Sequence, residues 1–392
     1  MARKIPVVKG VRWGAVDAGI RKRPALDLGV VLCSQPAAVA AIFTRSHAAA
    51  APVLLSRQRA RGGRAAAILV NAGCANACTT DGAEAAAAST AALASAIGAR
   101  PTQVLVASTG VIGARLPVRK VVAAVGPLVA SATEDGLPAF ARAIMTTDTR
   151  PKLAARSVGK AMVAGCAKGA GMIMPRMATM LAFVATDAAV PPPLLRRLLA
   201  EAAHDSFNAV TVDGDTSTND SLFLLATGAS GVEVRPGSAA ARRFGRALAE
   251  VCGELAREIA RDGEGATRLV TVHVVGARST ADADAVARRI ANSPLVKTAI
   301  HAADPNWGRI VAAAGTAGVR VDPARMSVAI GPATVFARGV ATTLAQERAA
   351  GRHLRGTEVE LTVQLGAGKA RRTIYSCDLS AEYVRINADY RS

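Results

Sequence analysis

Aromatic residues and long apolar runs are scarce in this chain of 392 residues. Phe, Trp and Tyr make up only 3% of it, although hydrophobic residues make up 51%. The core must therefore be built mainly from Ala, Val, Leu and Ile, and the length allows two domains or one large one. No apolar run reaches the roughly eighteen residues of a membrane span, and the N-terminal residues lack the unbroken apolar centre of a signal peptide. We therefore expect a cytoplasmic protein with no membrane partner.

Metal-binding patterns are missing too. The six cysteines, at positions 33, 74, 78, 166, 252 and 377, form no C-x-x-C pair, and the five dispersed histidines form no H-E-x-x-H motif. The acidic run at residues 211–220 suggests a calcium loop. Counted from Asp213, however, its sixth and twelfth positions are Thr218 and Leu224 rather than glycine and glutamate. We expect scattered buried thiols, no metal, and a hydrogen-bonded loop that braces an active site.

Acidic residues are few relative to basic ones. Lysine and arginine number 48 against 29 acidic residues, which gives a formal net charge of +19 and raises the hypothesis of a nucleic-acid-binding protein. The basic residues are spread through the expected helices rather than gathered into a block, and few aromatic side chains could stack on bases. This even distribution of basic residues indicates a composition bias of the whole chain, so we expect no nucleic-acid partner.

Short apolar runs alternate with amphipathic or alanine-rich segments, which is typical of α/β and α+β proteins. We expect an α/β fold of mixed α+β layers, with β-sheets packed against helices. The expected strands are 29–33, 66–70, 104–107, 180–185, 221–227, 269–275 and 359–365, and the expected helices are 83–97, 118–132, 191–204, 239–261, 281–291 and 338–350. Residues 147–160 look the least ordered and could separate two layers.

The most informative segment is residues 168–187, in which a glycine-rich loop leads through Pro175 to Ala178, Thr179 and an apolar run. A threonine hydroxyl is a poor nucleophile at neutral pH and needs a neighbouring base. Cleavage between Ala178 and Thr179 would create an α-amino group on the threonine itself. The pKa of such a group, about 7.7–8.0, suits it to accept a proton near neutrality. The bond therefore suggests a self-processing enzyme; the plainer alternative is a loop that enters a buried strand.

Other short runs carry unusual chemistry. Residues 108–113 follow an apolar strand and could aim a backbone N–H and a hydroxyl at one point, as an oxyanion hole requires; the alternative is an ordinary turn. Residues 145–149 could fix a polar substrate or simply cap a helix. Glu264 lies between two glycines, where it could bind an ammonium group or remain a solvated loop residue. Residues 386–392 form a specific ending, which indicates a packed or functional terminus.

Taken in order, these runs resemble the glutamate N-acetyltransferase / ornithine acetyltransferase family of the arginine pathway. The resemblance begins at residues 6–10 and continues through 70–79, 108–113, 145–149, 168–181, 211–221 and 304–309 to the last residue. It covers nearly the whole chain, and the ordered conjunction of the runs is far more specific than any one of them.

The resemblance implies a self-cleaved, N-terminal-threonine acyltransferase fold. Cleavage between Ala178 and Thr179 would give an α chain of residues 1–178 and a β chain of residues 179–392, assembled as two αβ units. Thr179 would carry the acetyl group in a ping-pong transfer from N2-acetylornithine to glutamate, with no metal or bound cofactor. Thr109 and Gly110 match the family's oxyanion pair. The substrate-contacting positions are matched by Thr147, Lys168, Thr179, Glu264, Asn387 and Ser392.

The chemistry of two matched residues fits the implied substrates. Both amino-acid substrates carry a carboxylate, which Lys168 is suited to meet, and ornithine carries a side-chain ammonium, a natural partner for Glu264. The substrate roles of Thr147, Asn387 and Ser392 rest on the resemblance alone. The sequence leaves open whether acetyl-CoA is also an acetyl donor, which separates bifunctional from monofunctional family members.

Three positions depart from the family pattern. Arg176 and Cys74 stand where asparagine is common, and Ala303 stands where glycine is usual. The first departure could change the rate of self-cleavage, and the other two concern local packing. None of them touches the nucleophile or the oxyanion pair.

Two other functions remain as alternatives. A self-processing aminopeptidase or amidase of similar fold would form the same acyl-enzyme and pass the acyl group to water. Glu264, Asn387 and Ser392 favour the acetyltransferase, because a broad peptidase has less use for a tailored amino-acid pocket. A basic binding protein would stay an intact chain and bind DNA with a steep salt dependence.

Overall fold

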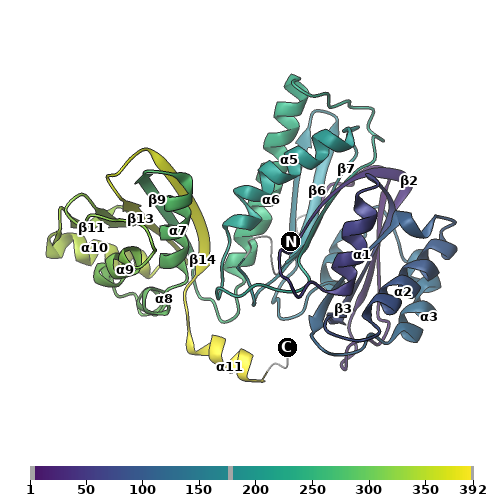
Figure 1. Ribbon diagram of the computed structural model, residues 1–392, viewed down its shortest axis with the longest axis horizontal. Coiled ribbons are helices and arrows are strands. Elements are labelled where there is room, and N and C mark those ends of the chain that lie inside the picture. The colour runs from purple at the N-terminus through teal and green to yellow at the C-terminus, as the bar shows by residue number, and fades with distance from the viewer. Residues whose placement is uncertain (1–4, 175–179, 390–392) are drawn as a thin grey trace. The chain divides into compact units, whose positions relative to one another are not determined.

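The computed structural model describes residues 5–174 and 180–389, and it divides into two compact units (Figure 1). The first unit contains the described residues of Met1–Asn208 and Asp215–Leu255, and the second those of Ala209–Gly214 and Ala256–Arg391. Each unit is a sheet packed against helices, so the α/β architecture expected from the sequence is confirmed.

The first unit is built on one mixed sheet, whose strand order within the described residues is β4-β3-β2-β8-β7-β6-β5, with β1 paired to β2. Its strands are β1 (Val11–Val16), β2 (Leu28–Phe43), β3 (Arg64–Cys74), β4 (Val104–Val111), β5 (Lys152–Val158), β6 (Ala161–Lys168), β7 (Leu181–Thr186) and β8 (Ser221–Ala226). Its helices are α1 (Ala51–Ala60), α2 (Gly82–Ala96), α3 (Val118–Ala130), α4 (Leu137–Ala143), α5 (Pro192–His204) and most of α6 (Ala239–Arg261). Two short 3-10 turns, Pro101–Gln103 and Phe207–Ala209, complete the regular structure around it.

Five of the scarce aromatic residues pack together in one core of this unit. Of the 7 Phe, 2 Trp and 3 Tyr in the chain, five form a continuous series of ring contacts with centroids 5.1–5.6 Å apart, namely Trp13, Phe140, Phe183, Phe223 and Phe43. Tilted and offset contacts of this kind add about 0.5–1.5 kcal/mol each beyond the area they bury. The core around them is otherwise Ala, Val, Leu and Ile, as expected.

The second unit has a sheet with the strand order β12-β11-β10-β13-β9-β14 in the described part of the chain. Its strands are β9 (Leu269–Ala277), β10 (Ser327–Ile330), β11 (Ala333–Ala337), β12 (Val340–Ala341), β13 (Glu358–Gln364) and β14 (Ala370–Cys377). Its helices are α7 (Thr280–Ala291), α8 (Pro294–His301), α9 (Trp307–Gly315), α10 (Leu344–Leu354) and α11 (Ala381–Asp389). Helix α7 packs against β9 and β14 and buries Val286 and Ile290 in the core.

Three expectations about local structure are wrong. The supposedly irregular residues 147–160 contain β5, which pairs with β6 along its whole length. Its buried residues are interrupted by partly exposed ones, which explains why no apolar run revealed it. The expected helix 338–350 instead begins at Leu344, because Thr343 caps it by accepting a hydrogen bond from Gln346 N, and the preceding residues form β12. The thiol of Cys78 is exposed, whereas four of the other cysteines are buried.

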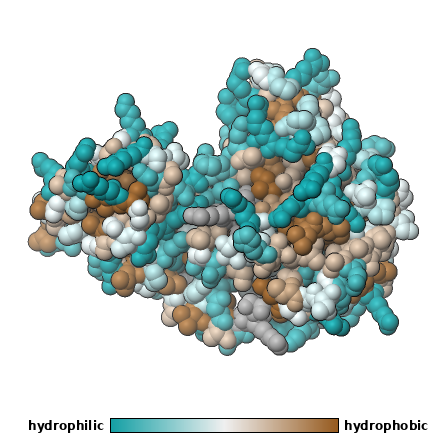
Figure 2. Space-filling model, viewed as in Figure 1, coloured by the Kyte–Doolittle hydropathy of each residue, from teal (hydrophilic) through white to brown (hydrophobic). Residues whose placement is uncertain are grey.

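The face of the molecule drawn in Figure 2 has no continuous apolar area. Figure 2 shows hydrophilic side chains scattered over the visible face, with smaller apolar patches between them. No helix in the described ranges is long and apolar enough to cross a membrane.

Candidate active site

The end of β4 packs directly against the backbone of β3, with no side chain between the two strands. Gly110 has φ +129°, and its Cα partner in the parallel strand β3 is Gly73. A Cβ on Gly110 would lie 2.3 Å from the carbonyl carbon of Gly73 and 2.6 Å from the nitrogen of Cys74. Only glycine fits here, and Thr109 beside it is half-buried. The local geometry therefore suits the pair to the oxyanion role matched from the sequence.

A single buried amide braces this turn. Asn219 Nδ2 donates to the carbonyl of Ser108 at 2.9 Å and to the carbonyl of Ala75 at 2.6 Å. The side chain of Ser108 is also fixed, because its Oγ donates to Asn71 Oδ1 of β3 at 2.6 Å. The loop at residues 211–220 is hydrogen-bonded as expected, and Asn219 joins it to the turn at residues 108–113.

Lys168 ends β6 inside a buried cluster of charges. Its Nζ donates to Thr146 Oγ1 at 2.7 Å and lies 3.7 Å from Asp148 Oδ2. The other oxygen of Asp148 binds Lys152 Nζ at 2.7 Å and accepts from Gly169 N at 2.6 Å. Burial alone raises the pKa of Asp148, but the charges of Lys168 and Lys152 and the bonds from Lys152 and Gly169 outweigh it and hold that pKa well below its usual range. Asp148 is therefore an anion that fixes Lys168 in place.

The strand register brings the start of β7 to this cluster. Leu181 is the Cα partner of Lys168 in β6 and of Ser221 in β8, and Ser221 N donates to the carbonyl of Met180 at 3.0 Å. Met180, the residue that follows Thr179, therefore lies between the ends of two neighbouring strands. Ala178 and Thr179 themselves lie outside the described residues.

In the second unit, two predicted substrate residues contact each other. Glu264 lies in the loop between α6 and β9, and Asn387 of α11 donates from Nδ2 to its Oε2 at 2.8 Å. The loop is tightly shaped on both sides of the carboxylate. Gly265 has φ +69°, a Cβ on it would lie 2.5 Å from Tyr383 N, and its carbonyl accepts from Ser380 Oγ at 2.6 Å. Glu264 is thus held, mostly buried, with one oxygen committed to an amide donor.

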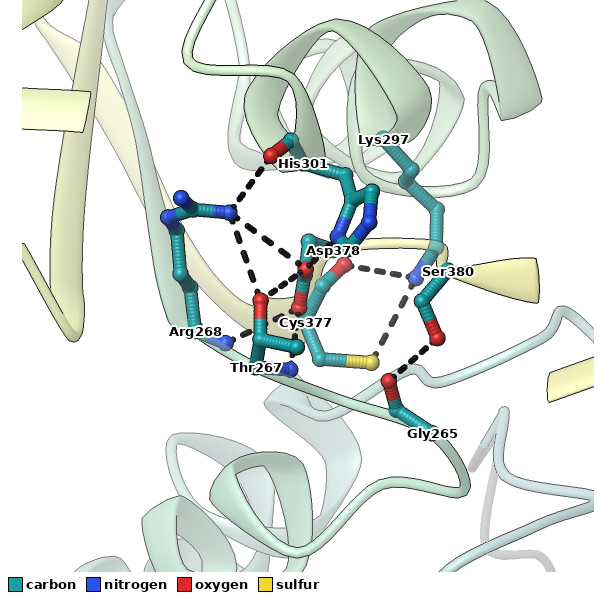
Figure 3. Close-up of polar contacts among 8 residues, drawn as sticks. All are labelled: Gly265, Thr267, Arg268, Lys297, His301, Cys377, Asp378 and Ser380. Atoms are coloured by element: carbon teal, nitrogen blue, oxygen red, sulfur yellow. Dashed lines mark hydrogen bonds and ion pairs between the residues drawn. The ribbon is translucent and has the colours of Figure 1, made fainter. Parts of the chain in front are cut away.

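A buried carboxylate fixes the far end of the same loop, as Figure 3 shows. Asp378 Oδ1 accepts from the backbone N–H groups of Thr267 and Arg268 at 2.8 and 2.9 Å, and its Oδ2 accepts from Thr267 Oγ1 at 2.5 Å and contacts His301 Nδ1 at 2.7 Å. Burial raises the pKa of Asp378, but the bonds from Thr267, His301 and Arg268 together lower it below its usual value. The loop that carries Glu264 is consequently anchored on both sides.

Lys297 supports this arrangement from α8. Its buried Nζ donates to the carbonyls of Cys377 and Val212, both at 2.7 Å. These bonds join the end of β14 to the segment 209–214. The ammonium group therefore replaces water for two otherwise buried carbonyls.

The predicted residues thus fall into three groups. Thr109, Gly110, Thr147 and Lys168 lie in the first unit, where Thr147 is half-buried between Thr146 and Asp148. Glu264 and Asn387 lie in the second unit. Ala178, Thr179 and Ser392 fall outside the described residues.

Sequence reasoning missed several groups that hold these residues, namely Lys152, Asn219 as a bracing amide, Lys297 and Asp378. Lys152 had a weak signal, because it lies within the polar segment 147–160. Asn219 lay in a run singled out for its polarity, without an individual role. Nothing local in the sequence marked Lys297 or Asp378.

The glycine turn at Gly110 and the buried lysine–carboxylate cluster around Lys168 both lie in the first unit, and together they are typical of an acyl-transferring α/β enzyme. The ArgJ family matches residues 12–392. The arginine biosynthesis bifunctional protein ArgJ of Geobacter sulfurreducens is 50% identical over 393 residues, covering 98% of this chain and 100% of its own. That of Desulfotalea psychrophila is 45% identical over 391 residues, with 98% and 100% covered. The crystal structure of arginine biosynthesis bifunctional protein argJ from Bacillus halodurans is 40% identical, with a TM-score of 0.50, and covers 52% of this chain and 96% of its own. The chain belongs to the ArgJ family.

Proposed function

We propose that this enzyme cleaves itself between Ala178 and Thr179 and then transfers acetyl from N2-acetylornithine to glutamate through an acetyl-Thr179 intermediate. Membership of the ArgJ family makes it an acetyltransferase of arginine biosynthesis. The self-cleavage, the ping-pong route and the individual residue roles are the proposed part.

One observation carries the proposal. The strand that follows Thr179 begins beside Lys168, since Leu181 is the Cα partner of Lys168. On its other side the same strand pairs with β8, which is preceded by Asn219, the residue that braces the oxyanion turn. A nucleophile at residue 179 is therefore tied through Met180 to both the lysine and the turn.

The chemistry follows from these placements. The α-amino group of Thr179 takes the hydroxyl proton as the oxygen attacks the acetyl carbonyl of N2-acetylornithine. The hydroxyl of Thr109 and the N–H of Gly110 stabilise the oxyanion, and one such donor lowers the barrier by about 3–4 kcal/mol. Ornithine leaves with the proton, and the amine of glutamate then attacks the acetyl-Thr179 ester by the reverse route. Lys168 binds the carboxylate of either substrate, and Glu264 binds the ammonium of ornithine, with Thr147, Asn387 and Ser392 completing the contacts.

The same scheme needs no metal or bound cofactor, because the acetyl group passes directly between the enzyme and its substrates. Acetyl-CoA is proposed only as a second acetyl donor, as the word bifunctional in the names of the two relatives suggests. We propose a cytoplasmic assembly of two αβ units. Measuring glutamate acetylation with acetyl-CoA alone decides between the bifunctional and monofunctional forms.

Self-cleavage is tested on the purified protein by a denaturing gel with N-terminal sequencing. A fragment that begins at Thr179 is expected, and Thr179→Ala should remain one full-length, inactive chain. A single full-length band from the unaltered protein would refute the mechanism. Cleavage also separates the enzyme from a basic binding protein, which would stay intact.

The substrate assignment is tested by comparing two fates of the acetyl group. Transfer from N2-acetylornithine to glutamate should greatly exceed the release of acetate. Predominant release would indicate the alternative, a self-processing aminopeptidase or amidase whose acyl-enzyme is attacked by water.

A further inference from the structure

One carboxylate holds the end of the loop that carries Glu264. Asp378 Oδ1 accepts from the N–H groups of Thr267 and Arg268 at 2.8 and 2.9 Å, and its Oδ2 accepts from Thr267 Oγ1 at 2.5 Å. Asp378 is only 1% exposed, so no solvent water is at hand to replace these bonds. Without the carboxylate, two backbone N–H groups of the loop lose their acceptor, and the path of the loop is no longer fixed at this end.

The chain that follows Asp378 holds the second predicted substrate residue of this unit. It leads through Ser380 into α11, which carries Asn387, the amide donor to Glu264 at 2.8 Å. Ser380 Oγ donates to the carbonyl of Gly265 at 2.6 Å, so the chain at the start of α11 is bound to the same loop. Asp378 therefore lies where the loop of Glu264 and the helix of Asn387 are joined.

His301 fixes the carboxylate from a third side of the chain. Its Nδ1 lies 2.7 Å from Asp378 Oδ2, and its carbonyl accepts from Arg268 Nη1 at 2.8 Å (Figure 3). His301 ends α8, and all of these residues lie in the second unit. A change at Asp378 can therefore reach Glu264 within one unit of the fold.

We propose that Asp378 is a positioning residue for the ammonium-binding pair of Glu264 and Asn387. The inference rests on the proposed role of Glu264 and adds the residue that holds it. Asp378 acts through the loop, and the loop presents the carboxylate of Glu264 in a fixed position to the side-chain ammonium of N2-acetylornithine. Such preorganisation matters because a displacement of about 1 Å can remove most of the benefit of a substrate contact.

The two substrates give a readout that a merely structural role would not produce. In a ping-pong transfer, the kcat/KM of each substrate reports its own half of the reaction, and glutamate has no side-chain ammonium for Glu264 to bind. Asp378→Ala should therefore lower kcat/KM for N2-acetylornithine by about threefold to tenfold and leave kcat/KM for glutamate near the wild-type value. A simple loss of folded enzyme would lower both values by the same factor, and that result would overturn the proposal.

Two milder variants test the individual bonds. Asp378→Asn should restore most of kcat/KM for N2-acetylornithine, because the amide oxygen can still accept from the N–H groups of Thr267 and Arg268. Thr267→Val removes only the hydroxyl bond to Asp378 Oδ2 and should cause a smaller fall that is again confined to N2-acetylornithine. If Asp378→Ala does not fold, Thr267→Val decides the question, and the absence of a selective fall counts against the positioning role.

Asp284→Asn is a matched control from the same unit. Asp284 of α7 binds Arg288 Nε at 2.8 Å and Arg372 Nε at 2.9 Å, and neither arginine belongs to the loop of Glu264. Its replacement should lower the melting temperature but leave both kcat/KM values unchanged in the folded protein. A selective fall for N2-acetylornithine in this variant would show that any lost ion pair of the unit has the same effect, and the assignment to Asp378 would fail.

A double-mutant cycle separates this proposal from the proposed role of Glu264. If Asp378 acts through Glu264, Asp378→Ala should cause no further loss of kcat/KM for N2-acetylornithine in the Glu264→Gln protein. Additive losses would refute the positioning role and leave Glu264 as the ammonium contact. A Glu264→Gln protein that uses N2-acetylornithine as well as the wild type would instead remove that part of the proposed function.

Discussion

Replacing Gly110 by alanine tests the oxyanion turn more sharply than any other single change. The new Cβ would lie 2.3 Å from the carbonyl carbon of Gly73, where ordinary contacts are 3.4–4 Å, and it would meet backbone atoms that cannot rotate away. The backbone angle of φ +129° is also nearly confined to glycine. Strain of this kind costs about 1–3 kcal/mol and overpacking a similar amount, so we expect Gly110→Ala to lose about 2–6 kcal/mol of unfolding free energy.

The kinetic effect should be larger than the loss of stability suggests. Either β3 or β4 must move to admit the methyl group, and the N–H of Gly110 moves with it. The loss of one oxyanion donor lowers kcat by about 10²–10³-fold. Acetyl transfer should fall accordingly in protein that is still folded, as judged from urea unfolding measured on the same sample.

Gly113→Ala provides the control for this prediction. Gly113 also has a positive φ, +79°, but nothing lies within 4 Å of a Cβ built on it. Its replacement should cost only the backbone strain, about 1–2 kcal/mol, and leave the rate of transfer near that of the wild type. If the two alanine variants are equally stable and equally active, the close approach of β4 to β3 does not matter, and the assignment of Gly110 fails.

Three further predictions concern residues outside the turn. Asp148→Asn leaves two buried lysines without their shared anion and should cost about 3–5 kcal/mol in urea unfolding at pH 7. Because the pKa of Asp148 is lowered by folding, this contribution is present above about pH 4 and is lost as the pH falls towards the folded value, so an equal difference between variant and wild type at pH 7 and pH 3 would refute the reasoning. Glu264→Gln keeps an acceptor for Asn387 but removes the negative charge. Steady-state kinetics should show the KM for N2-acetylornithine raised roughly tenfold, with a smaller change in kcat. An unchanged KM would exclude a contact between residue 264 and the ammonium group. Ala303→Gly should stabilise the protein by about 0.5–1 kcal/mol in urea unfolding, because Ala303 has φ +55° at the end of α8, and a loss of stability would contradict the strain argument.

The buried centre of the fold could be predicted because its strands are apolar on both faces. Strands β7 and β8 are buried at every position, so each is a continuous apolar run in the sequence. Strand β5 was missed because it contains Lys152 and Arg156 and its buried residues are interrupted by partly exposed ones. Lys152 is buried in this strand and paired with Asp148, four residues before it, and an apolar run cannot mark a strand that contains such a residue.

Some residues of the candidate site could also be predicted from the sequence, and others could not. Gly110, Lys168 and Glu264 could be proposed from the sequence because an ordered set of motifs resembled a known family. The groups that hold them could not, since each acts across the chain: Asp378 is 111 residues from Thr267, and Asn219 is 111 residues from Ser108. Such contacts depend on how the sheets bring distant segments together, and an aspartate or asparagine in a loop has the same local sequence signal whether it is solvated or buried.

The proposed cut also divides the chain differently from the fold. The first unit contains strands from both sides of residue 178, and β7 lies between β6 and β8, paired with each over six residues. The chains 1–178 and 179–392 are thus a prediction about chemistry and not about folding units. Hydrolysis of one peptide bond leaves both of these buried ladders intact, so the fragments should remain associated. The strand that follows the proposed cut is therefore held from both sides by its ladders, and the preorganisation that acyl transfer requires can be built on a strand held in this way.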